Sequence, residues 1–322
     1  MKAIALFSGG LDSQLAVCLL KEQGVEVIAL NFATPFFGAT PKTYQAARDL
    51  QVELMTIDIG DVYMDKVLRN PVYGYGKNLN PCIDCHAYML KTAGQYMESL
   101  GASFLATGEV LGQRPMSQNK SALQAVEKLS GMRGLIVRPL SGRLLLPTIP
   151  EQEGWLDREK LLDISGRSRK RQMELAEHYK ITDYPSPAGG CLLTDQNFAR
   201  RLFDLLSKNP APRTDEIELL KLGRHFQIEP ETLLVIGRNH SENEQLNKLS
   251  RPGDLLLKVA DHPGPLALIR GKDVLEEPQL QYPASLVARY SDAKHEALAS
   301  VKIMEFDETE KQIIQVAPAP QS

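Results

Sequence analysis

The chain has 322 residues, of which 43% are hydrophobic and 24% are charged, and its formal net charge is −3 at pH 7. This size and composition predict a globular protein of about two domains, and they exclude the overall basic surface of many nucleic-acid binders. No apolar run has the length of a membrane span and no secretory leader is recognisable, so we expect a cytoplasmic protein with no membrane partner.

The first half of the chain alternates apolar strands with helices. Strands separated by helices indicate a parallel sheet covered on both faces, which is a doubly wound α/β fold. Ligands of such sheets bind at the carboxyl ends of the strands. We predict strands at 3–7, 26–32, 53–59, 103–107 and 135–138, and helices at 12–22, 43–50 and 84–100.

The second half of the chain changes character twice. A stretch rich in proline and glycine at 139–154 precedes predicted helices at 157–164, 169–178 and 198–207. Beyond these helices, the mixture of short helices and strands predicts a smaller α+β domain. We therefore expect a first domain at 1–208, a linker at 209–215, the α+β domain at 216–312 and a disordered tail at 313–322.

A turn of glycines, hydroxyls and one carboxylate joins the first strand to the first helix. The free N–H groups at a helix start and the positive end of its dipole bind anions, and glycine lets the backbone approach them. A carboxylate beside phosphate requires a cation, so we expect Mg²⁺ on Asp12. A plain strand–helix turn needs neither this acid nor two serines. The turn consists of Ser8, Gly9, Gly10, Leu11, Asp12 and Ser13.

The SGGLDS turn is not a Walker A motif, since GxxxxGK[ST] is absent. It closely resembles the pyrophosphate loop (PP-loop) of the N-type ATP pyrophosphatases. This resemblance implies ATP as cosubstrate, transfer of AMP to a carbonyl oxygen and release of pyrophosphate. The family includes amide-forming synthetases and tRNA sulfur-insertion enzymes, so the loop alone does not identify the substrate.

Polar residues beyond other strand ends are expected to line the same cleft. The two residues that end the second strand should lie near the adenosine, and the residues after the fourth strand are candidates to hold nucleotide or the substrate base. Glu109 has the alternative role of a helix cap. The candidates are Asn31, Phe32, Thr107, Gly108, Glu109, Gln113, Ser117 and Gln118.

Three of the four cysteines lie in loops or at a helix start beside proline or glycine, where thiolates can converge. These are Cys82 and Cys85 in NPCIDCH and Cys191 in PAGGC, whereas Cys18 has apolar neighbours and is expected in the core. Structural disulfides are not expected in a cytoplasmic chain.

Three chemistries suit such a trio of thiols. Three thiolates can hold a [4Fe–4S] cluster with one iron open, or Cys82 or Cys85 can form a persulfide and disulfide pair with Cys191. A zinc site would need a fourth ligand, from His86 or His178. Unrelated loop thiols are the fourth alternative.

The cysteine motifs resemble those of tRNA thiolation enzymes. NPCIDCH is similar to the NPCxxC motif of bacterial tRNA 2-thiouridylases, and TGEVLGQRPMSQ at 107–118 is similar to a stretch of the 4-thiouridine synthetases. A CxxC with a distant third cysteine also resembles cluster-dependent enzymes, which implies Cys82, Cys85 and Cys191 as ligands of [4Fe–4S]. The resemblance covers about 1–195, without the extra domains that bind tRNA or deliver persulfide sulfur.

Two regions are candidates for RNA contact. The densest basic run contains Arg167, Arg169, Lys170 and Arg171, although charge runs are often solvated faces. The region 216–294 resembles the RNA-binding domain of the NFACT proteins, with its GRN element and a His-Pro-Gly core. Its polar candidates are Arg238, Asn239, His240 and Asn243, with Lys258 and Arg270 for phosphates. GRN has the alternative role of a turn and helix cap.

Together these features predict an ATP-dependent uridine sulfurtransferase that acts on tRNA or another structured RNA. The sulfur donor would be sulfide or a cysteine desulfurase relay, and a homodimer is left open. The alternatives are an amide- or nitrile-forming synthetase for a small molecule, and an RNA- or ribosome-binding factor whose nucleotide site is only regulatory.

Overall fold

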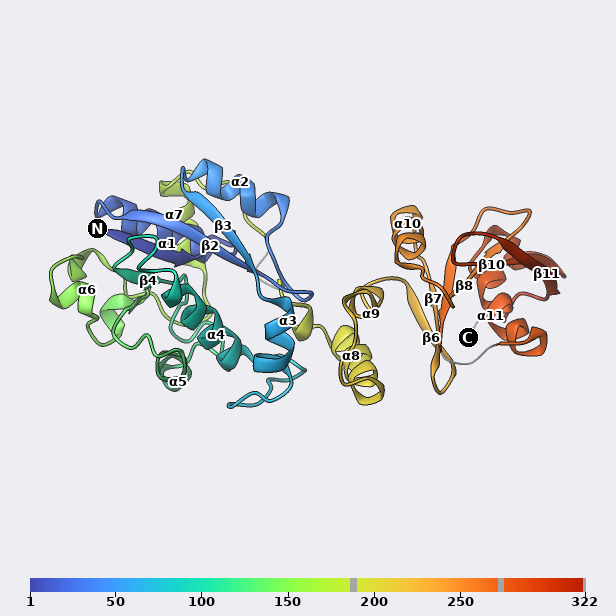
Figure 1. Cartoon of the computed structure of the whole chain (residues 1–322). Coiled ribbons are helices and arrows are strands. Elements are labelled where there is room, and N and C mark those ends of the chain that lie inside the picture. The colour runs from blue at the N-terminus through green and yellow to red at the C-terminus, as the bar shows by residue number, and fades with distance from the viewer. Residues whose placement is uncertain (186–189, 272–274, 321–322) are drawn as a thin grey trace. The chain divides into compact units, whose positions relative to one another are not determined.

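The computed structural model describes residues 1–185, 190–271 and 275–320 (Figure 1). The chain divides into two compact units, Met1–Ala199 and Arg200–Ser322. This boundary lies inside helix α8 (Gln196–Lys208), earlier than the linker that the sequence indicates. Within the described ranges, no helix combines the length and the apolar composition that a membrane crossing requires.

The first unit contains a five-stranded parallel sheet of order β3-β2-β1-β4-β5. This confirms the predicted doubly wound α/β fold. Figure 1 shows helices on both faces of the sheet. The strands are β1 (Lys2–Leu6), β2 (Glu26–Ala33), β3 (Glu53–Asp58), β4 (Phe104–Ala106) and β5 (Ile136–Val137), and the helices before α8 are α1 (Leu11–Glu22), α2 (Pro41–Asp49), α3 (Gly60–Tyr63), α4 (Cys82–Gln95), α5 (Lys120–Ser130), α6 (Ile149–Gln152) and α7 (Lys170–His178).

The central strand β1 determines where the candidate residues gather. It pairs with β2 on one side and with β4 on the other, with Ala5 opposite Ala29 and Ala106. Because the sheet is parallel, the loops after β1, β2 and β4 leave it at the same edge. Small alanines on these strands let α1 pack close to the sheet through the buried Val17 and Leu20.

The helix predicted at 157–164 is wrong. Only Arg158–Lys160 form a single 3₁₀ turn, and the rest of the segment is extended. The backbone N–H groups of Leu162 and Ile164 donate to the carbonyls of Pro139 and Leu140. The chain therefore satisfies its backbone groups by pairing with an earlier segment while burying Ile164, and a helix would lose both contacts.

The second unit contains a six-stranded antiparallel sheet of order β11-β10-β8-β9-β7-β6. Apolar side chains cover both faces: Leu219 and Leu246 from helices pack on one, and Leu280 and Val287 on the other. The strands are β6 (Arg224–Glu229), β7 (Thr232–Ile236), β8 (Leu255–Val259), β9 (Ala267–Arg270), β10 (Ala299–Glu305) and β11 (Glu310–Val316), and the helices are α9 (Thr214–Leu219), α10 (His240–Leu249) and α11 (Glu277–Arg289).

The disordered tail predicted at 313–322 is wrong where the structure describes it. Residues 313–316 belong to β11, which pairs with β10 along its length. Ile314 and Val316 alternate into the core, and the N–H of Ala319 donates to the carbonyl of Ser285. The alternation of apolar residues outweighs the proline-rich ending in setting the structure. Residues 321–322 lie outside the described ranges.

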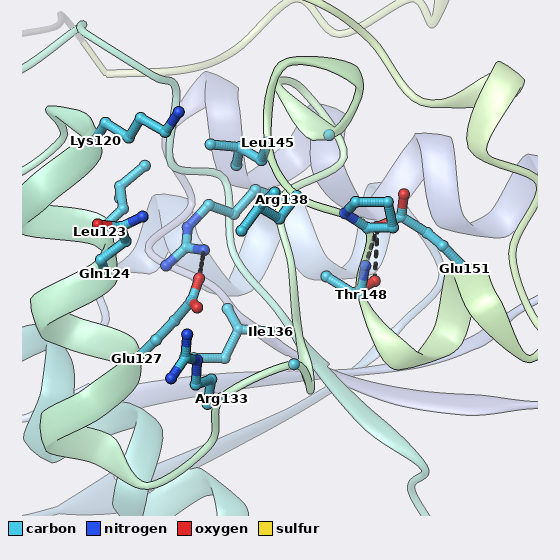
Figure 2. Close-up of a pocket in the computed structure, with 14 residues that line it drawn as sticks. Lys120, Leu123, Gln124, Glu127, Arg133, Ile136, Arg138, Leu145, Thr148 and Glu151 are labelled. Carbon is cyan, nitrogen blue, oxygen red and sulfur yellow. Dashed lines mark hydrogen bonds and ion pairs between the residues drawn. The ribbon is translucent and has the colours of Figure 1, made fainter.

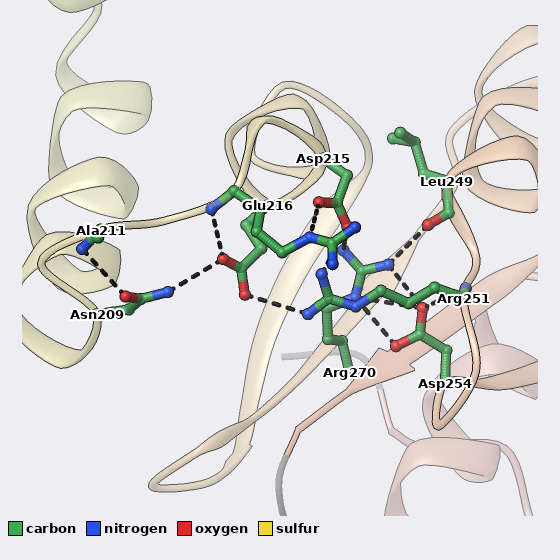
Figure 3. A network of polar contacts seen from close by, with 9 residues as sticks. Asn209, Ala211, Asp215, Glu216, Leu249, Arg251, Asp254 and Arg270 are labelled. Atoms are coloured by element: carbon green, nitrogen blue, oxygen red, sulfur yellow. Dashed lines mark hydrogen bonds and ion pairs between the residues drawn. The ribbon is translucent and has the colours of Figure 1, made fainter. Parts of the chain in front are cut away.

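A buried ionic network ties α9 to the strands of the second unit (Figure 3). Every guanidinium nitrogen of Arg270 donates: Nε and Nη2 to Asp254, Nη2 also to the carbonyl of Leu249, and Nη1 to Asp215. Arg251 pairs with Asp215 as well. Because Arg270 and Asp254 are both buried, removing either one leaves an uncompensated charge.

We predict that Asp254→Ala destabilises the second unit by about 3 kcal/mol, because it leaves the buried Arg270 guanidinium without its main partner. Urea unfolding measures the loss, and hydrogen exchange assigns it to β8 and β9. The control is Arg213→Ala, which removes an ion pair between the exposed Arg213 and Asp215 and should cost far less, because solvent screens that pair. Equal losses in the two variants would contradict the structural role of the network.

Candidate active site

The glycine turn after β1 exposes the amino end of α1. Gly10 is the N-cap residue in an extended conformation, and no side chain caps the helix. Gly9 has φ +76°, and a Cβ there would lie 2.9 Å from the Thr43 Cα, so glycine is required. The Ser13 hydroxyl donates to the Gly10 carbonyl at 2.8 Å, and the Ser8 and Ser13 hydroxyls lie 3.4 Å apart. The amino end of α1 thus has the features of a phosphate site.

One carboxylate oxygen of Asp12 accepts a hydrogen bond from the chain, and the other has no partner among the described residues. Its Oδ2 accepts from the Gln113 amide at 2.8 Å, while Oδ1 is buried without a partner among the described residues. The Gln113 carbonyl in turn accepts from the amide of Gln172 at 3.3 Å. An unpartnered carboxylate oxygen at a phosphate site fits a Mg²⁺ ligand.

Gln172 was not among the residues singled out from the sequence. It lies on α7 and is fully buried. Gln172 lies in the first turn of its helix, directly after the basic run. Nothing in its sequence neighbourhood indicates a contact with the glycine turn. The contact becomes visible only because α7 packs against α1 in the fold.

Gly108 brings the loop after β4 against the start of α1. A Cβ on Gly108 would lie 2.6 Å from backbone atoms of Asp12 and Ser13, so no other residue fits without moving one loop. The neighbouring Thr107 hydroxyl donates to Glu109 Oε2 at 3.0 Å. The loop after β4 is therefore fixed to the glycine turn.

Glu109 is the centre of a buried network, which is more than a helix cap requires. Its Oε1 lies 2.7 Å from His86 Nδ1 and its Oε2 accepts from Arg138 Nε at 2.9 Å, while Arg138 Nη1 donates to Glu127. Burial alone would raise the pKa of the Glu109 carboxyl, but Arg138 and His86 outweigh it and lower the pKa to about 2. Since His86 follows Cys85 directly, the network joins the cysteine helix to the loop after β4.

Asn31, at the same edge of the sheet, also has a side-chain oxygen that accepts no hydrogen bond from the described residues. Its amide nitrogen donates to the Phe7 carbonyl at 2.8 Å, and its Oδ1 is buried with no partner in the described part of the chain. Phe32 is buried. Gln118 is buried as well, and its Oε1 has no partner in the same ranges. These side chains remain candidates for the nucleotide or the base.

The three loop cysteines come together. Cys82 and Cys85 occupy the first turn of α4, and the Leu192 N–H beside Cys191 donates to the Phe36 carbonyl at 3.0 Å. Burial raises the pKa of Cys85, and the nearby Cys191 and Cys82 raise it further. Burial raises the pKa of Cys191 to about 11, with Cys82 adding to the shift. The thiols are thus close enough to interact.

Cys18 is separate from this trio. It is buried on α1, and burial raises its pKa to about 11. Its apolar surroundings agree with the core position expected from the sequence.

The described residues include no group of three or more His, Cys, Asp or Glu side chains arranged to hold a single metal ion. His86 is engaged with Glu109, and His178 lies against Tyr179 and 3.9 Å from Glu22. Neither histidine joins the thiols, which speaks against the zinc alternative. A four-iron cluster places its ligands on different irons, so thiols around it lie farther apart than around one ion.

A small cavity of about 130 Å³ lies between α5, β5 and the segment before α6 (Figure 2). Arg138 and Glu127 form part of its wall, with Lys120 at the side. Pockets for drug-sized ligands are typically about 300–1,000 Å³, so this one is too small for a nucleotide. The candidates for nucleotide binding are instead the uncapped N–H groups of α1 and the unpartnered side-chain oxygens at the carboxyl edge of the sheet.

The basic run lies at the start of α7. Arg167 and Lys170 are exposed, and Arg169 is half-buried with its Nε unpartnered within the described ranges. Arg171 pairs with Asp163 at 2.6 Å. These cations therefore precede Gln172 on the same short segment. The basic run is thus next to the relay of hydrogen bonds from Gln172 through Gln113 to Asp12.

The candidates of the second unit have different surroundings. Asn239 caps α10 by accepting from the Glu242 N–H at 3.0 Å, and Arg238 pairs with Glu242, which agrees with a turn-and-cap role for GRN. His240 and Lys258 are exposed. The surroundings of Arg270 favour a structural role over the predicted phosphate contact, because each guanidinium nitrogen already donates inside the unit.

Two family profiles match the chain. The profile described as thiamine biosynthesis protein (ThiI) matches residues 1–143, and the one described as NFACT protein RNA binding domain matches residues 223–322. The matched residues 1–143 lie within the first unit, which contains the parallel sheet and the glycine turn. The two resemblances predicted from the motifs are thereby confirmed.

Individual relatives cover parts of the chain. A tRNA-specific 2-thiouridylase from Clostridium acetobutylicum is 34% identical over 33% of this chain and 35% of its own length. A tRNA sulfurtransferase from Desulfurococcus amylolyticus is 27% identical over 52% of this chain and 32% of its own. A solved 4-thiouridine synthetase–RNA complex with bound ATP has 20% identity and a TM-score of 0.42, covering 68% of this chain and 52% of that one. The chain thus spans only about a third of these curated relatives.

We predict that Gln172→Leu weakens ATP binding about fivefold when Mg²⁺ is present, because the Gln113 amide loses the partner that orients it toward Asp12. Titration calorimetry with Mg²⁺, and again with EDTA, measures the effect, and binding in EDTA should not change. Gln124→Leu on the exposed face of α5 is the control. An equal loss with and without Mg²⁺ would show general damage and contradict the relay.

We predict that Glu109→Gln lowers the free energy of unfolding by about 3 kcal/mol at pH 7, because the buried Arg138 loses one of its two carboxylate partners. The pKa of Glu109 is lower in the folded chain than its ordinary value of about 4.5, so the ionised carboxylate stabilises the fold at every pH above about 4.5. This contribution disappears as the pH falls toward about 2. The difference between wild type and variant should therefore shrink over that window in urea unfolding. Glu26→Gln removes an exposed pair and is the control; a pH-independent difference would refute the prediction.

Proposed function

We propose that this protein is an ATP-dependent sulfurtransferase that replaces a uracil oxygen of tRNA, or of another structured RNA, with sulfur in the cytoplasm. One observation carries the proposal: the CxxC helix and the glycine turn are joined by two short contacts. His86, next to Cys85, contacts Glu109, and the adjacent Gly108 packs against the backbone of Asp12. A nucleotide site and a thiol site connected so directly suit two steps on one substrate atom.

In the first step, the glycine turn would hold ATP and activate the base. Free N–H groups at the start of α1 and the hydroxyls of Ser8 and Ser13 face the phosphates, and Asp12 Oδ1 is available to Mg²⁺, which offsets charge on the leaving pyrophosphate. The uracil oxygen attacks the α-phosphorus and pyrophosphate leaves. The oxygen then belongs to a good leaving group, AMP, which a sulfur nucleophile can displace.

In the second step, the thiols would supply sulfur. We propose that Cys82, Cys85 and Cys191 bind a [4Fe–4S] cluster, since they interact without converging on one ion. A cluster with one iron free of protein ligands supplies a place for sulfide. The alternative is a persulfide on one cysteine that is resolved by another. Sulfide would renew the sulfur of a cluster directly. A cysteine desulfurase relay would renew a persulfide after an external thiol has reduced the disulfide left by the resolving cysteine.

The RNA would be held by both units. The basic run at the start of α7 precedes Gln172, so a phosphate bound there lies on the segment that supports Asp12. In the second unit, the match to an RNA-binding domain and the exposed His240 and Lys258 support contacts to RNA. An amide-forming synthetase for a small molecule would need neither RNA contacts nor the three thiols.

We predict that the anaerobic wild-type protein forms AMP and pyrophosphate only with RNA present, and incorporates ³⁵S into that RNA. Asp12→Asn should reduce AMP formation at least 100-fold, because Mg²⁺ loses its ligand. Cys82→Ala, Cys85→Ala and Cys191→Ala should each abolish ³⁵S incorporation, whereas Cys18→Ala is the matched control and should retain it. Iron and sulfide assays on each variant identify the cofactor.

The outcomes separate the alternatives. Full thiolation by an iron-free protein would reject the cluster and favour the persulfide. A cluster that survives in any of the three alanine variants would reject the ligand set. Absence of RNA-dependent AMP formation would reject the enzymatic proposal and leave an RNA-binding factor.

A further inference from the structure

A buried hydroxyl lies among the three thiols and was not predicted from the sequence. Tyr63 ends α3 and is fully buried, and its hydroxyl lies against the Cys85 thiol without a hydrogen bond of normal geometry among the residues that the structure describes. Burial, and next the adjacent Cys85, raise the pKa of Tyr63, with Cys191 and Cys82 adding to the shift. The hydroxyl thus lies beside Cys85, with the charges of the other two thiols near enough to act on it.

The surrounding aromatic residues hold the ring in this place. Phe36 lies 6.0 Å from the Tyr63 ring centroid, and Phe37 packs edge-to-face at 5.6 Å. Phe36 also accepts the N–H of Leu192 beside Cys191 and packs against Phe198. One short turn therefore positions both Tyr63 and the segment of the third cysteine.

Nearby polar groups have other partners. The Asp84 carboxylate accepts from the backbone N–H groups of Val72 and Tyr73 at 2.6 and 3.0 Å, so it fixes the loop before the CxxC motif. Asn80 donates its amide to the Cys82 sulfur at 3.2 Å. Within the described part of the chain, the Tyr63 hydroxyl forms no hydrogen bond of normal geometry, and the Cys85 thiol is the polar group that it contacts.

A buried hydroxyl without a hydrogen bond of normal geometry costs about 1–3 kcal/mol, so such groups are rarely kept without a role. A phenol at neutral pH is a hydrogen-bond donor. The neighbouring atoms are sulfurs, and a site for sulfur transfer adds an acceptor that the chain itself does not contain. A negatively charged sulfur is the acceptor that suits this position.

We propose that the Tyr63 hydroxyl donates a hydrogen bond to an anionic sulfur that is bound at Cys82, Cys85 and Cys191. Tyr63 is then the residue that holds the sulfur before its transfer. This inference rests on the proposed function. The acceptor is either the sulfide of an iron–sulfur site or the outer sulfur of a cysteine persulfide, and the two share the same chemistry.

The test compares the wild-type chain with Tyr63→Phe, which keeps the ring and its contacts with Phe36 and Phe37. Both proteins are purified anaerobically, treated with iron and sulfide, assayed for iron and titrated with ³⁵S-sulfide. We expect equal iron content, equal ATP affinity and equal melting temperature, but at least tenfold weaker sulfide binding in Tyr63→Phe. The control Tyr44→Phe removes an exposed hydroxyl of the same unit and should bind sulfide as the wild type does.

If neither protein retains iron, the cluster is rejected but this inference is still tested. The proteins are then loaded with persulfide, and mass spectrometry follows its lifetime in mild reductant; Tyr63→Phe should shorten it at least tenfold. Unchanged sulfide affinity in the iron-loaded proteins, or unchanged persulfide lifetime in the iron-free ones, would overturn the inference. Neither result depends on RNA thiolation, so failure of the proposed function is recognised separately.

Discussion

The contact between Gly108 and the first turn of α1 is the constraint on which the rest of the candidate site depends. Because no side chain fits between them, the loop after β4 lies directly against the backbone of Asp12. Glu109 then extends this contact to His86 and so to the cysteine helix. A phosphate site made of backbone groups and a thiol site on a separate helix thus share one frame, and a buried ion pair with Arg138 stabilises it.

The buried polar groups of the candidate site differ in whether they have hydrogen-bond partners. Asp12, Asn31 and Tyr63 each keep one buried polar atom without a hydrogen bond of normal geometry among the described residues, whereas Glu109 uses both carboxylate oxygens within the chain. Unpartnered buried groups cost stability, and functional sites are where proteins retain them. Asp12 and Asn31 therefore remain candidates for ligand contact, whereas Glu109 is occupied in supporting the site.

Local signals explain what could be predicted from the sequence. The glycine turn, the CxxC pair and the strands depend on residues adjacent in the chain, so their spacing was informative. Gln172 and Tyr63 act through contacts between segments far apart in sequence, and nothing beside them signals it. The surroundings of Arg270 were not evident either, because a basic residue in a strand looks exposed, but β9 is covered on both faces and its arginine turns to Asp254.

The charge distribution limits how RNA can be held. With a net charge of −3, attraction must come from local cations, and several of these are engaged internally: Arg238 pairs with Glu242, and Arg251 with Asp215. Cations that are paired inside the chain release no counterions, so these arginines would add little to the salt dependence of RNA binding. Under the proposed function, the sequence or shape of the RNA would then contribute more of the affinity than its charge does.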